Sequence, residues 1–238
     1  MDNKLFNMVK RRFCGSLEVK EYRRRVRRGL LTWEKAVALK YLSPPGSLLD
    51  IGCGAGREAL VLYDMGHTVV GVDISPGMIE AAKSIAHEEG KDITFCLCDG
   101  IGLDFPDSSF QYVVIWGQAL GNIPGHSNRL HLLSECLRVL KLSGRLIFSV
   151  HNRDVCEPIA YEKGWVREAK DMLLEDGDFI LEGDAPSASD TLCFWHYFRY
   201  DEVVRLCEEA GFLLLECKLA SDFGQKGWDT IWVCVCEK

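Results

Sequence analysis

Residues 48–56, Leu-Leu-Asp-Ile-Gly-Cys-Gly-Ala-Gly, are the stretch that decides the fold. The apolar residues around Asp50 predict the end of a buried parallel strand. The three glycines that follow permit a tight turn and a close approach of the backbone to a ligand, which a Cβ would block. A helix-forming segment comes next and stops at Gly66. A strand, a glycine turn and a helix N-terminus together predict a site for a polar cofactor.

The spacing of the glycines indicates which cofactor this is. A dinucleotide site needs G-x-G-x-x-G, whereas this chain has G-x-G-x-G with Arg57 at the third glycine position of that motif. The carboxylate of Asp50 would repel a pyrophosphate and attract an ammonium group. S-adenosylmethionine carries an ammonium group and a sulfonium and has no phosphate. The pattern therefore favours this cofactor, with a purely structural turn as the alternative.

Acidic residues also end the next two predicted strands. Asp73 closes the run 69–75 (VVGVDIS), where it would accept both ribose hydroxyls of an adenosine, and Ile74 would cover one adenine face. Asp99 closes the run 93–100 (ITFCLCDG), where it would accept the adenine amino group. Trp116 stands at the tip of a fourth predicted strand. These positions are consistent with one adenosine bound across the ends of adjacent strands.

The segments LLDIGCGAG, VVGVDIS, CDG, FPDSSFQYVV and LRVLKLSGRLIFSV, in this order, resemble the class I S-adenosylmethionine-dependent methyltransferases, most of all those acting on small molecules. The resemblance is strong over 45–150 and weaker over 196–238, and it departs at Gln111, where Asp is usual. It implies a seven-stranded, mostly parallel Rossmann-like sheet flanked by helices, with S-adenosylhomocysteine as product. The residues expected to bind the cofactor are Asp50, Gly52, Cys53, Gly54, Gly56, Asp73, Ile74, Asp99, Gly100 and Trp116.

We expect two regions. Residues 1–44 form an N-terminal helical segment that caps the substrate or serves as a docking arm, and residues 45–238 form the methyltransferase domain. A lid insertion over 152–196 reads as a β-hairpin with a polar turn around Pro186. Five arginines within 23–28 have three interpretations: an arm for RNA, a solvated face packed on an acidic body, or one arginine turned inward toward the methionine carboxylate or an acidic substrate.

The acceptor is predicted to lie outside the carboxyl ends of the strands. His151 and His196 are the candidates for a general base, which is needed only for an acceptor that is protonated at neutral pH, and each is also interpretable as a structural histidine. The residues expected to contact the acceptor are Trp116, Asn152, Arg153, Trp195 and Tyr197.

Composition predicts the redox state, the cellular location and the partners of the chain. The chain has 238 residues, a net charge of −7 and eleven cysteines without any C-x-x-C spacing. We therefore expect a reduced, cytoplasmic protein without metal or membrane contact, as a monomer or homodimer. The predicted function is methyl transfer to an N, O or S atom of a small molecule, mainly by proximity and orientation. The alternatives are methylation of tRNA or a protein side chain, and a non-catalytic cofactor-binding protein.

Overall fold

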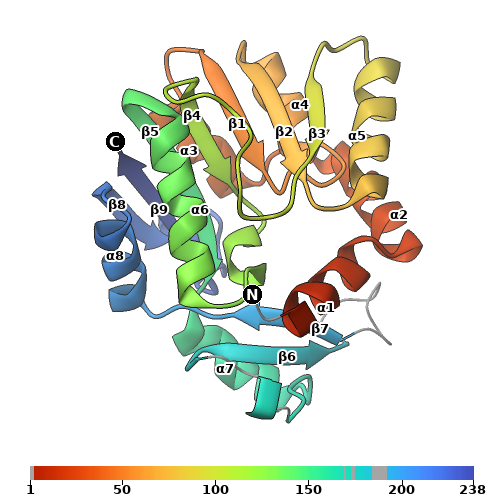
Figure 1. Ribbon diagram of the computed structural model, residues 1–238, viewed down its shortest axis with the longest axis vertical. Coiled ribbons are helices and arrows are strands. Elements are labelled where there is room, and N and C mark those ends of the chain that lie inside the picture. Colours follow the sequence, from red (N-terminus) through yellow and green to blue (C-terminus); the bar gives the residue numbers. More distant parts are fainter. Residues whose placement is uncertain (1–2, 169, 173–174, 184–191) are drawn as a thin grey trace.

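A seven-stranded sheet forms the centre of the computed structural model, which describes residues 3–168, 170–172, 175–183 and 192–238. Its strands follow the order β3-β2-β1-β4-β5-β9-β8, and only β9 runs antiparallel to its neighbours (Figure 1). The fold class expected from the sequence is therefore confirmed. The strands are β1 (Ser47–Ile51), β2 (Thr68–Asp73), β3 (Thr94–Leu97), β4 (Phe110–Ile115), β5 (Leu140–His151), β8 (Leu213–Leu219) and β9 (Ile231–Glu237).

Helices cover both faces of this sheet. One apolar cluster joins α3, α4 and α5 to the face that carries Leu48, Val114 and Ile147. A second cluster joins α6 and α8 to the opposite face, which carries Leu49 and Val113. Neighbouring residues such as Leu48 and Leu49 belong to opposite clusters, because successive side chains of a strand point to opposite faces. The helices are α3 (Thr32–Tyr41), α4 (Arg57–Asp64), α5 (Pro76–Glu88), α6 (His126–Val139) and α8 (Tyr200–Glu209).

Residues 3–28 form α1 (Asn3–Phe13), α2 (Ser16–Arg25) and the short 3₁₀ helix η1 (Val26–Arg28). Helix α1 packs through Leu5 and Val9 against Ile180 and Phe194 of the insertion. Helix α2 lies against α5. The first part of the chain is thus helical and contacts both the insertion and the sheet domain (Figure 1).

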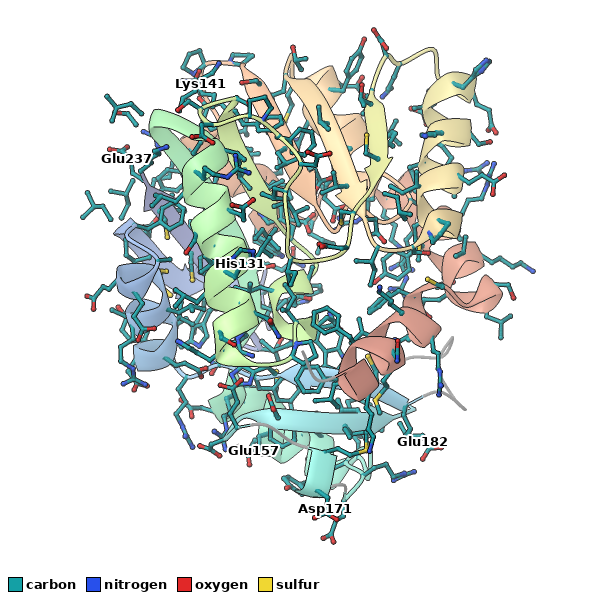
Figure 2. All side chains as sticks on the ribbon, viewed as in Figure 1. His131, Lys141, Glu157, Asp171, Glu182 and Glu237 are labelled. Carbon is teal, nitrogen blue, oxygen red and sulfur yellow. The ribbon has the colours of Figure 1, made fainter. Side chains whose placement is uncertain are left out.

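The insertion between β5 and α8 contains α7 (Arg153–Glu162), η3 (Lys170–Met172) and an antiparallel pair, β6 (Asp178–Glu182) with β7 (Leu192–His196). This pair matches the two strands that the sequence predicts, whereas the turn expected around Pro186 lies outside the described residues. Figure 2 shows Asp171 on the side of this unit away from the sheet. No helix within the described ranges has the length and hydropathy needed to cross a bilayer.

Two local features fix the cofactor-side edge of the sheet. The Ser75 hydroxyl caps α5 by accepting the backbone N–H of Met78 at 3.3 Å, with Pro76 at the first helical position, as the sequence predicts. Beyond β4, the 3₁₀ helix η2 (Ala119–Asn122) turns back over the strand ends. A Cβ on its Gly121 would lie 2.8 Å from the carbonyl oxygen of His196, so η2 and β7 are in close contact.

Candidate functional site

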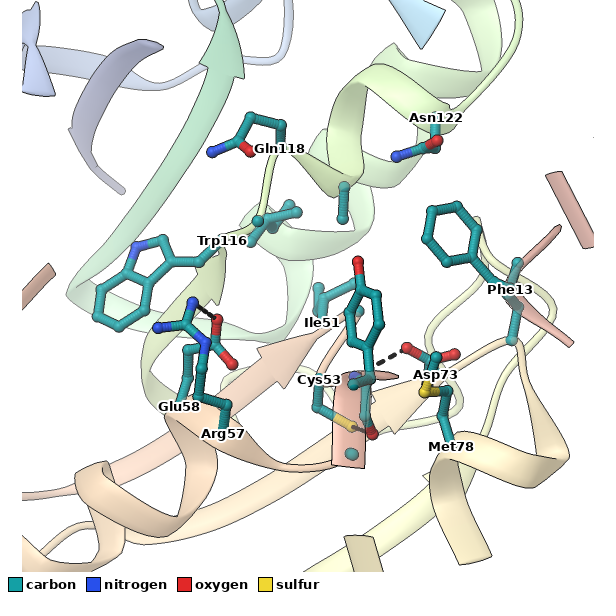
Figure 3. Close-up of a pocket in the computed structure, with 18 of the residues that line it drawn as sticks. Phe13, Ile51, Cys53, Arg57, Glu58, Asp73, Met78, Trp116, Gln118 and Asn122 are labelled. Carbon is teal, nitrogen blue, oxygen red and sulfur yellow. Dashed lines mark hydrogen bonds and ion pairs between the residues drawn. The ribbon is translucent and has the colours of Figure 1, made fainter. Parts of the chain in front are cut away.

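A cavity of about 300 Å³ lies at the carboxyl ends of β1, β2 and β4, the edge where open parallel sheets bind ligands. In Figure 3, Trp116, Arg57 and Glu58 lie on one side of it, and Asp73 and Met78 lie on the other. Seven of the expected cofactor residues line the cavity: Gly52, Cys53, Gly54, Asp73, Ile74, Gly100 and Trp116.

The glycine turn has the backbone that only glycine adopts without strain. Gly52 has φ +74° and Gly54 has φ +52°, both in the left-handed region. The N–H groups of Gly52 and Cys53 donate to the carbonyl oxygen of Val72, at 2.8 and 3.1 Å. Asp73 fixes the turn from the side, because its Oδ2 accepts the N–H of Gly54 at 2.9 Å. The turn is therefore bonded to the end of β2 at three points.

A buried acidic group lies at the β1 side of the cavity. Asp50 is 1% exposed, and its Oδ2 has no hydrogen-bond partner among the described residues. Burial, reinforced by the negative charge of Glu58, raises the pKa of Asp50 well above its usual range. Burial also raises the pKa of Glu58 to about 7, although Arg57 opposes this shift. These carboxyl groups would gain from a cation brought by a ligand.

Arg57 organises this acidic group. Its guanidinium forms an ion pair with Glu58 and a bidentate pair with Glu34 of α3, at 2.6 and 2.7 Å. It also donates to the carbonyl oxygen of Gly29. The sequence analysis did not identify Arg57, Glu58 or Glu34 as site residues. The position of Arg57 and Glu58 directly after the glycine turn is a usable signal, whereas the pairing with Glu34 depends on the tertiary structure.

Three expected cofactor residues lie outside the set that lines the cavity. Asp50 is one of them, because its side chain is buried. Asp99 accepts the backbone N–H groups of Ile101 and Gly102 with its Oδ1, and its neighbours Cys98 and Gly100 line the cavity instead. Gly56 precedes α4, and a Cβ there would lie 3.2 Å from the Phe95 ring. Gly56 thus permits close helix packing, and any cofactor role of these residues stays a prediction.

The opposite wall of the cavity comes from the N-terminal helices and η2. Phe6, Val9 and Phe13 of α1 line it, and Asn122 of η2 lies across from them. Tyr22 of α2 sits on the glycine turn, because a Cβ at Gly54 would lie 2.9 Å from its ring. The sequence analysis did not single out these residues of α1 and α2, since apolar spacing on a helix predicts packing and ligand contact equally well.

The two candidate histidines do not line the cavity. His151 ends β5 and packs edge-on against Trp195 and Tyr197, with ring centroids 4.8 and 5.2 Å away. His196 is fully buried: its Nδ1 lies 2.7 Å from Asp178 and its Nε2 lies 2.7 Å from Glu202. Hydrogen bonds to these carboxylates raise the pKa of His196, although burial opposes the shift. Both contact sets are structural, and a catalytic role for either histidine stays a prediction.

The expected acceptor residues outside the sheet domain also have structural partners. Asn152 caps α7 by accepting the N–H of Asp154, and it donates to the carbonyl oxygen of Asp229. Arg153 forms a bidentate pair with Asp176 and a further bond to Glu157. The end of β5 points toward α7 and the β6–β7 pair, so these side chains hold the insertion together. Of the five acceptor candidates, only Trp116 lines the cavity.

Within the described ranges, Glu175, Asp178 and His196 are the one group of three side chains close enough to share a metal ion. Arg129, which is fully buried, already places its guanidinium 2.8 Å from Glu175 and 3.8 Å from Glu202. A guanidinium therefore supplies positive charge to this group.

The arginine run is divided between two environments. Arg23 pairs with Glu88 of α5, and Arg24 and Arg25 both pair with Glu21. Arg25 and Arg28 line the cavity. Among the described residues, no carboxylate forms an ion pair with Arg28. The pairing of three arginines with neighbouring carboxylates supports the packed-face interpretation. The position of Arg28 at the cavity agrees with the interpretation in which one arginine turns inward.

Comparisons with known proteins agree with this geometry. Residues 48–144 match the family model described as a methyltransferase domain. The 2-methyl-6-phytyl-1,4-hydroquinone methyltransferase of Synechocystis sp. is 32% identical over 155 residues, which cover 62% of this chain and 46% of that protein. The demethylmenaquinone methyltransferase of Thermus thermophilus is 35% identical over 120 residues, covering 49% and 53%. The chain thus spans about half the length of these relatives.

A solved S-adenosylmethionine-dependent methyltransferase from Methanosarcina mazei superposes with a TM-score of 0.70 at 25% identity, over 85% of this chain and 96% of that one. Fold, glycine turn and family match agree with one another. Residues 48–144 form a methyltransferase domain, and the chain has the fold of the S-adenosylmethionine-dependent methyltransferases.

The residues present fit the cofactor of this family. The unpartnered Oδ2 of buried Asp50 suits the cofactor's ammonium group, and the glycine turn leaves the space that a Cβ would fill. The Trp116 indole Nε1–H is a second buried polar group without a partner among the described residues, in a side chain that lines the cavity. A donor of this kind suits a carboxylate.

Proposed function

We propose that this protein transfers the methyl group of S-adenosylmethionine to an N, O or S atom of a small-molecule acceptor. The observation that carries the proposal is the division of one cavity into two parts. Arg57, Glu58 and Asp73 line it near the ends of β1 and β2, and the apolar side chains of Phe6, Val9 and Phe13 line it from α1. A donor and an acceptor placed in these two parts would meet within one cavity.

In this proposal each part of the chain has a defined task. Asp50 and Glu58 bind the ammonium group of the cofactor, Arg28 and the Trp116 indole N–H bind its carboxylate, and Asp73 accepts its ribose hydroxyls. The sulfonium supplies an activated methyl group when the cofactor is bound. The protein then contributes by aligning the acceptor and excluding water, which supply much of the rate in such a reaction.

The acceptor class follows from the wall and from the relatives. Phe6, Val9 and Phe13 form an apolar wall, and the names of the two curated relatives specify a hydroquinone and a demethylmenaquinone. We therefore add to the proposal that the acceptor carries an aromatic ring. The amide groups of Gln118 and Asn122, which also line the cavity, would orient its polar substituents.

The test combines calorimetry with a methyl-donor assay. S-adenosylhomocysteine should bind, and labelled S-adenosylmethionine should transfer its methyl group to at least one member of a panel of hydroquinones, phenols, amines and thiols. The same assay with bulk tRNA and with total protein tests the alternatives. Methylation of either polymer but of no small molecule would overturn the proposal, as would cofactor binding without any transfer across all three panels.

A salt titration separates the RNA alternative further. An electrostatic arm predicts RNA binding that weakens steeply with salt and with Arg23→Ala or Arg27→Ala. The ion pairs of Arg23, Arg24 and Arg25 with Glu88 and Glu21 lead us to expect no such retention at physiological salt.

A further inference from the structure

Four cysteines gather between α8, β8 and β9, outside the cavity. Cys217 of β8 and Cys234 of β9 stand directly opposite each other in the antiparallel pairing, and their sulfur atoms are 3.1 Å apart. Cys207 of α8 and Cys236 of β9 form a second pair, with sulfur atoms 3.6 Å apart. These four thiols are not among the groups of three ligands close enough to share a metal ion in the described ranges.

The first pair has the geometry that a disulfide requires. Directly opposed residues of antiparallel strands have Cα atoms about 4.5–5.5 Å apart, within the range of about 4.4–6.8 Å that disulfides span. Closing the bond requires the sulfur atoms to approach by about 1 Å, to the disulfide length of about 2.05 Å. Side-chain rotation within the existing strand pairing supplies this movement.

We propose that Cys217 and Cys234 form a redox modification site, a dithiol that a hydroperoxide oxidises to a disulfide across β8 and β9. This inference does not depend on the proposed function.

Exposure sets the order of the two steps. Cys217 is half-buried, whereas Cys234 is fully buried. Cys217 therefore meets the oxidant. Its sulfur takes one oxygen from the hydroperoxide and becomes a sulfenic acid, and the rest of the hydroperoxide leaves as water or an alcohol. The sulfur of Cys234 then attacks that of Cys217 and displaces the oxygen as a second water molecule, which carries away the Cys234 proton. Two thiols lose two electrons and two protons, and the hydroperoxide is reduced.

The site lies at the base of a connection that reaches the cavity. Between the two cysteines the chain forms η5 (Ala220–Phe223), which packs against α3. The side-chain oxygen of Gln225 accepts the N–H of Thr32 at the start of α3, and Trp228 lines the cavity. A disulfide between Cys217 and Cys234 would close this connection into a covalent loop, restraining a segment of the cavity wall.

The experiment uses the full chain with Cys14→Ser, because Cys14 is the exposed cysteine and would form disulfides between molecules. After treatment with hydrogen peroxide, we expect the denatured protein to lose two alkylatable thiols and the mass of two hydrogens, reversibly with a dithiol reductant. Cleavage beside Glu216 and Lys218 should release Cys217 linked to the peptide that carries Cys234. We also expect the melting temperature to rise by about 5 °C.

Matched variants assign the bond. Cys217→Ser should abolish the loss of thiols, whereas Cys207→Ser and Cys236→Ser should retain it. A linked peptide pairing Cys207 with Cys236, or a wild-type chain that keeps all of its thiols at peroxide concentrations that oxidise a free cysteine peptide, would overturn the proposal. The mapping on the wild-type cysteines stays decisive if a variant fails to fold.

Discussion

The carboxylate of Asp73 accepts the backbone N–H of Gly54 at 2.9 Å through Oδ2 and the N–H of Ser75 at 2.8 Å through Oδ1. One side chain thus joins the glycine turn after β1 to the start of α5. Each oxygen keeps a further acceptor position, which a ribose hydroxyl would use. The same residue therefore shapes the turn and contacts the cofactor in our proposal.

Replacing Asp73 should weaken cofactor binding strongly. Asp73→Ala removes charge-assisted hydrogen bonds worth about 1.5–3 kcal/mol each, so we expect the Kd for S-adenosylhomocysteine to rise by roughly 10- to 100-fold. Calorimetry measures this value, with Asp92→Asn, at an exposed position of the same domain, as the control. Equal affinities for the two variants would contradict the assignment of Asp73.

The glycine turn should not tolerate a side chain at residue 54. Gly54→Ala combines a positive φ with a Cβ that lies 2.9 Å from Tyr22. Gly90 has φ +67° with no atom near its added Cβ, so Gly90→Ala measures the cost of the conformation alone, about 1 kcal/mol. We expect Gly54→Ala to lose more stability in urea unfolding and to lose cofactor binding, while Gly90→Ala retains binding. Binding regained in Tyr22→Ala/Gly54→Ala would show that the collision with Tyr22 alone causes the loss.

Cofactor affinity should depend on pH through Glu58. Its pKa of about 7 means that the carboxyl is largely protonated at pH 6, whereas an ammonium ligand favours the ionised form. Binding should therefore release a proton, and affinity should fall by up to about tenfold per pH unit below pH 7. Calorimetry in buffers of different ionisation enthalpy measures the proton release. Glu58→Gln should bind with a flatter pH profile, and an unchanged profile would rule out Glu58 as the titrating group.

The stability of the protein carries the opposite pH dependence at this residue. A carboxyl whose pKa is raised in the folded state binds its proton more tightly than in the unfolded chain. The contribution of Glu58 is therefore most favourable below its ordinary pKa of 4.5 and is lost as pH rises through about 7. Comparing urea midpoints of the wild type and Glu58→Gln across this window checks the sign, because the Gln variant should lose less stability with rising pH.

His196 should act as a structural residue of the insertion. His196→Ala removes the imidazole that lies 2.7 Å from the fully buried carboxylate of Asp178, a change that costs about 3–5 kcal/mol in comparable buried pairs. The raised pKa of His196 means that its stabilising effect is complete below pH 6.5 and declines as pH rises through the folded-state value. Urea unfolding at pH 6 and pH 8 should show a larger effect of His196→Ala at pH 6. Normal stability with lost methyl transfer would favour the catalytic interpretation instead.

Arg28 should recognise the amino-acid end of the cofactor. Arg28→Gln is expected to weaken S-adenosylhomocysteine about tenfold and to leave 5′-methylthioadenosine, which lacks the carboxylate, unaffected. Arg27→Gln, at the neighbouring position, which is also exposed but does not line the cavity, is the matched control. Equal losses for both ligands would indicate a general effect on the pocket, and no loss for either would assign Arg28 to the acceptor or to the surface.

The parallel sheet and the glycine turn could be predicted because their signals are local. Asp50 lies within one short apolar run and Asp73 ends another, and Ser75 with Pro76 marks the start of a helix within a few residues. The cavity wall could not be predicted in the same way. Phe13 and Tyr22 line it only because α1 and α2 fold back over the strand ends, and the Glu34–Arg57 pair joins residues 23 positions apart.

The histidine candidates illustrate the same limit. The rule that ligands bind at strand ends selected His151, because it ends β5, but the chain beyond β5 builds α7 and the β6–β7 pair around that position. His196 lies in an alternating run, which predicts burial of every second residue without stating what buries it. The two carboxylates that contact the His196 ring, those of Asp178 and Glu202, come from two different elements.

Helix α1 packs on Ile180 and Phe194 of the insertion while its Phe6 and Phe13 line the cavity, and Tyr22 of the following helix rests on the glycine turn. In our proposal, the same short N-terminal segment thus contacts both the donor part and the acceptor part of the cavity. An arrangement of this kind couples the two ligands, since whichever binds first sets the position of the helices that the second must meet. We therefore expect bound S-adenosylhomocysteine to change the affinity for the acceptor, and the acceptor to change the affinity for S-adenosylhomocysteine by the same factor, which calorimetry with each ligand in turn measures.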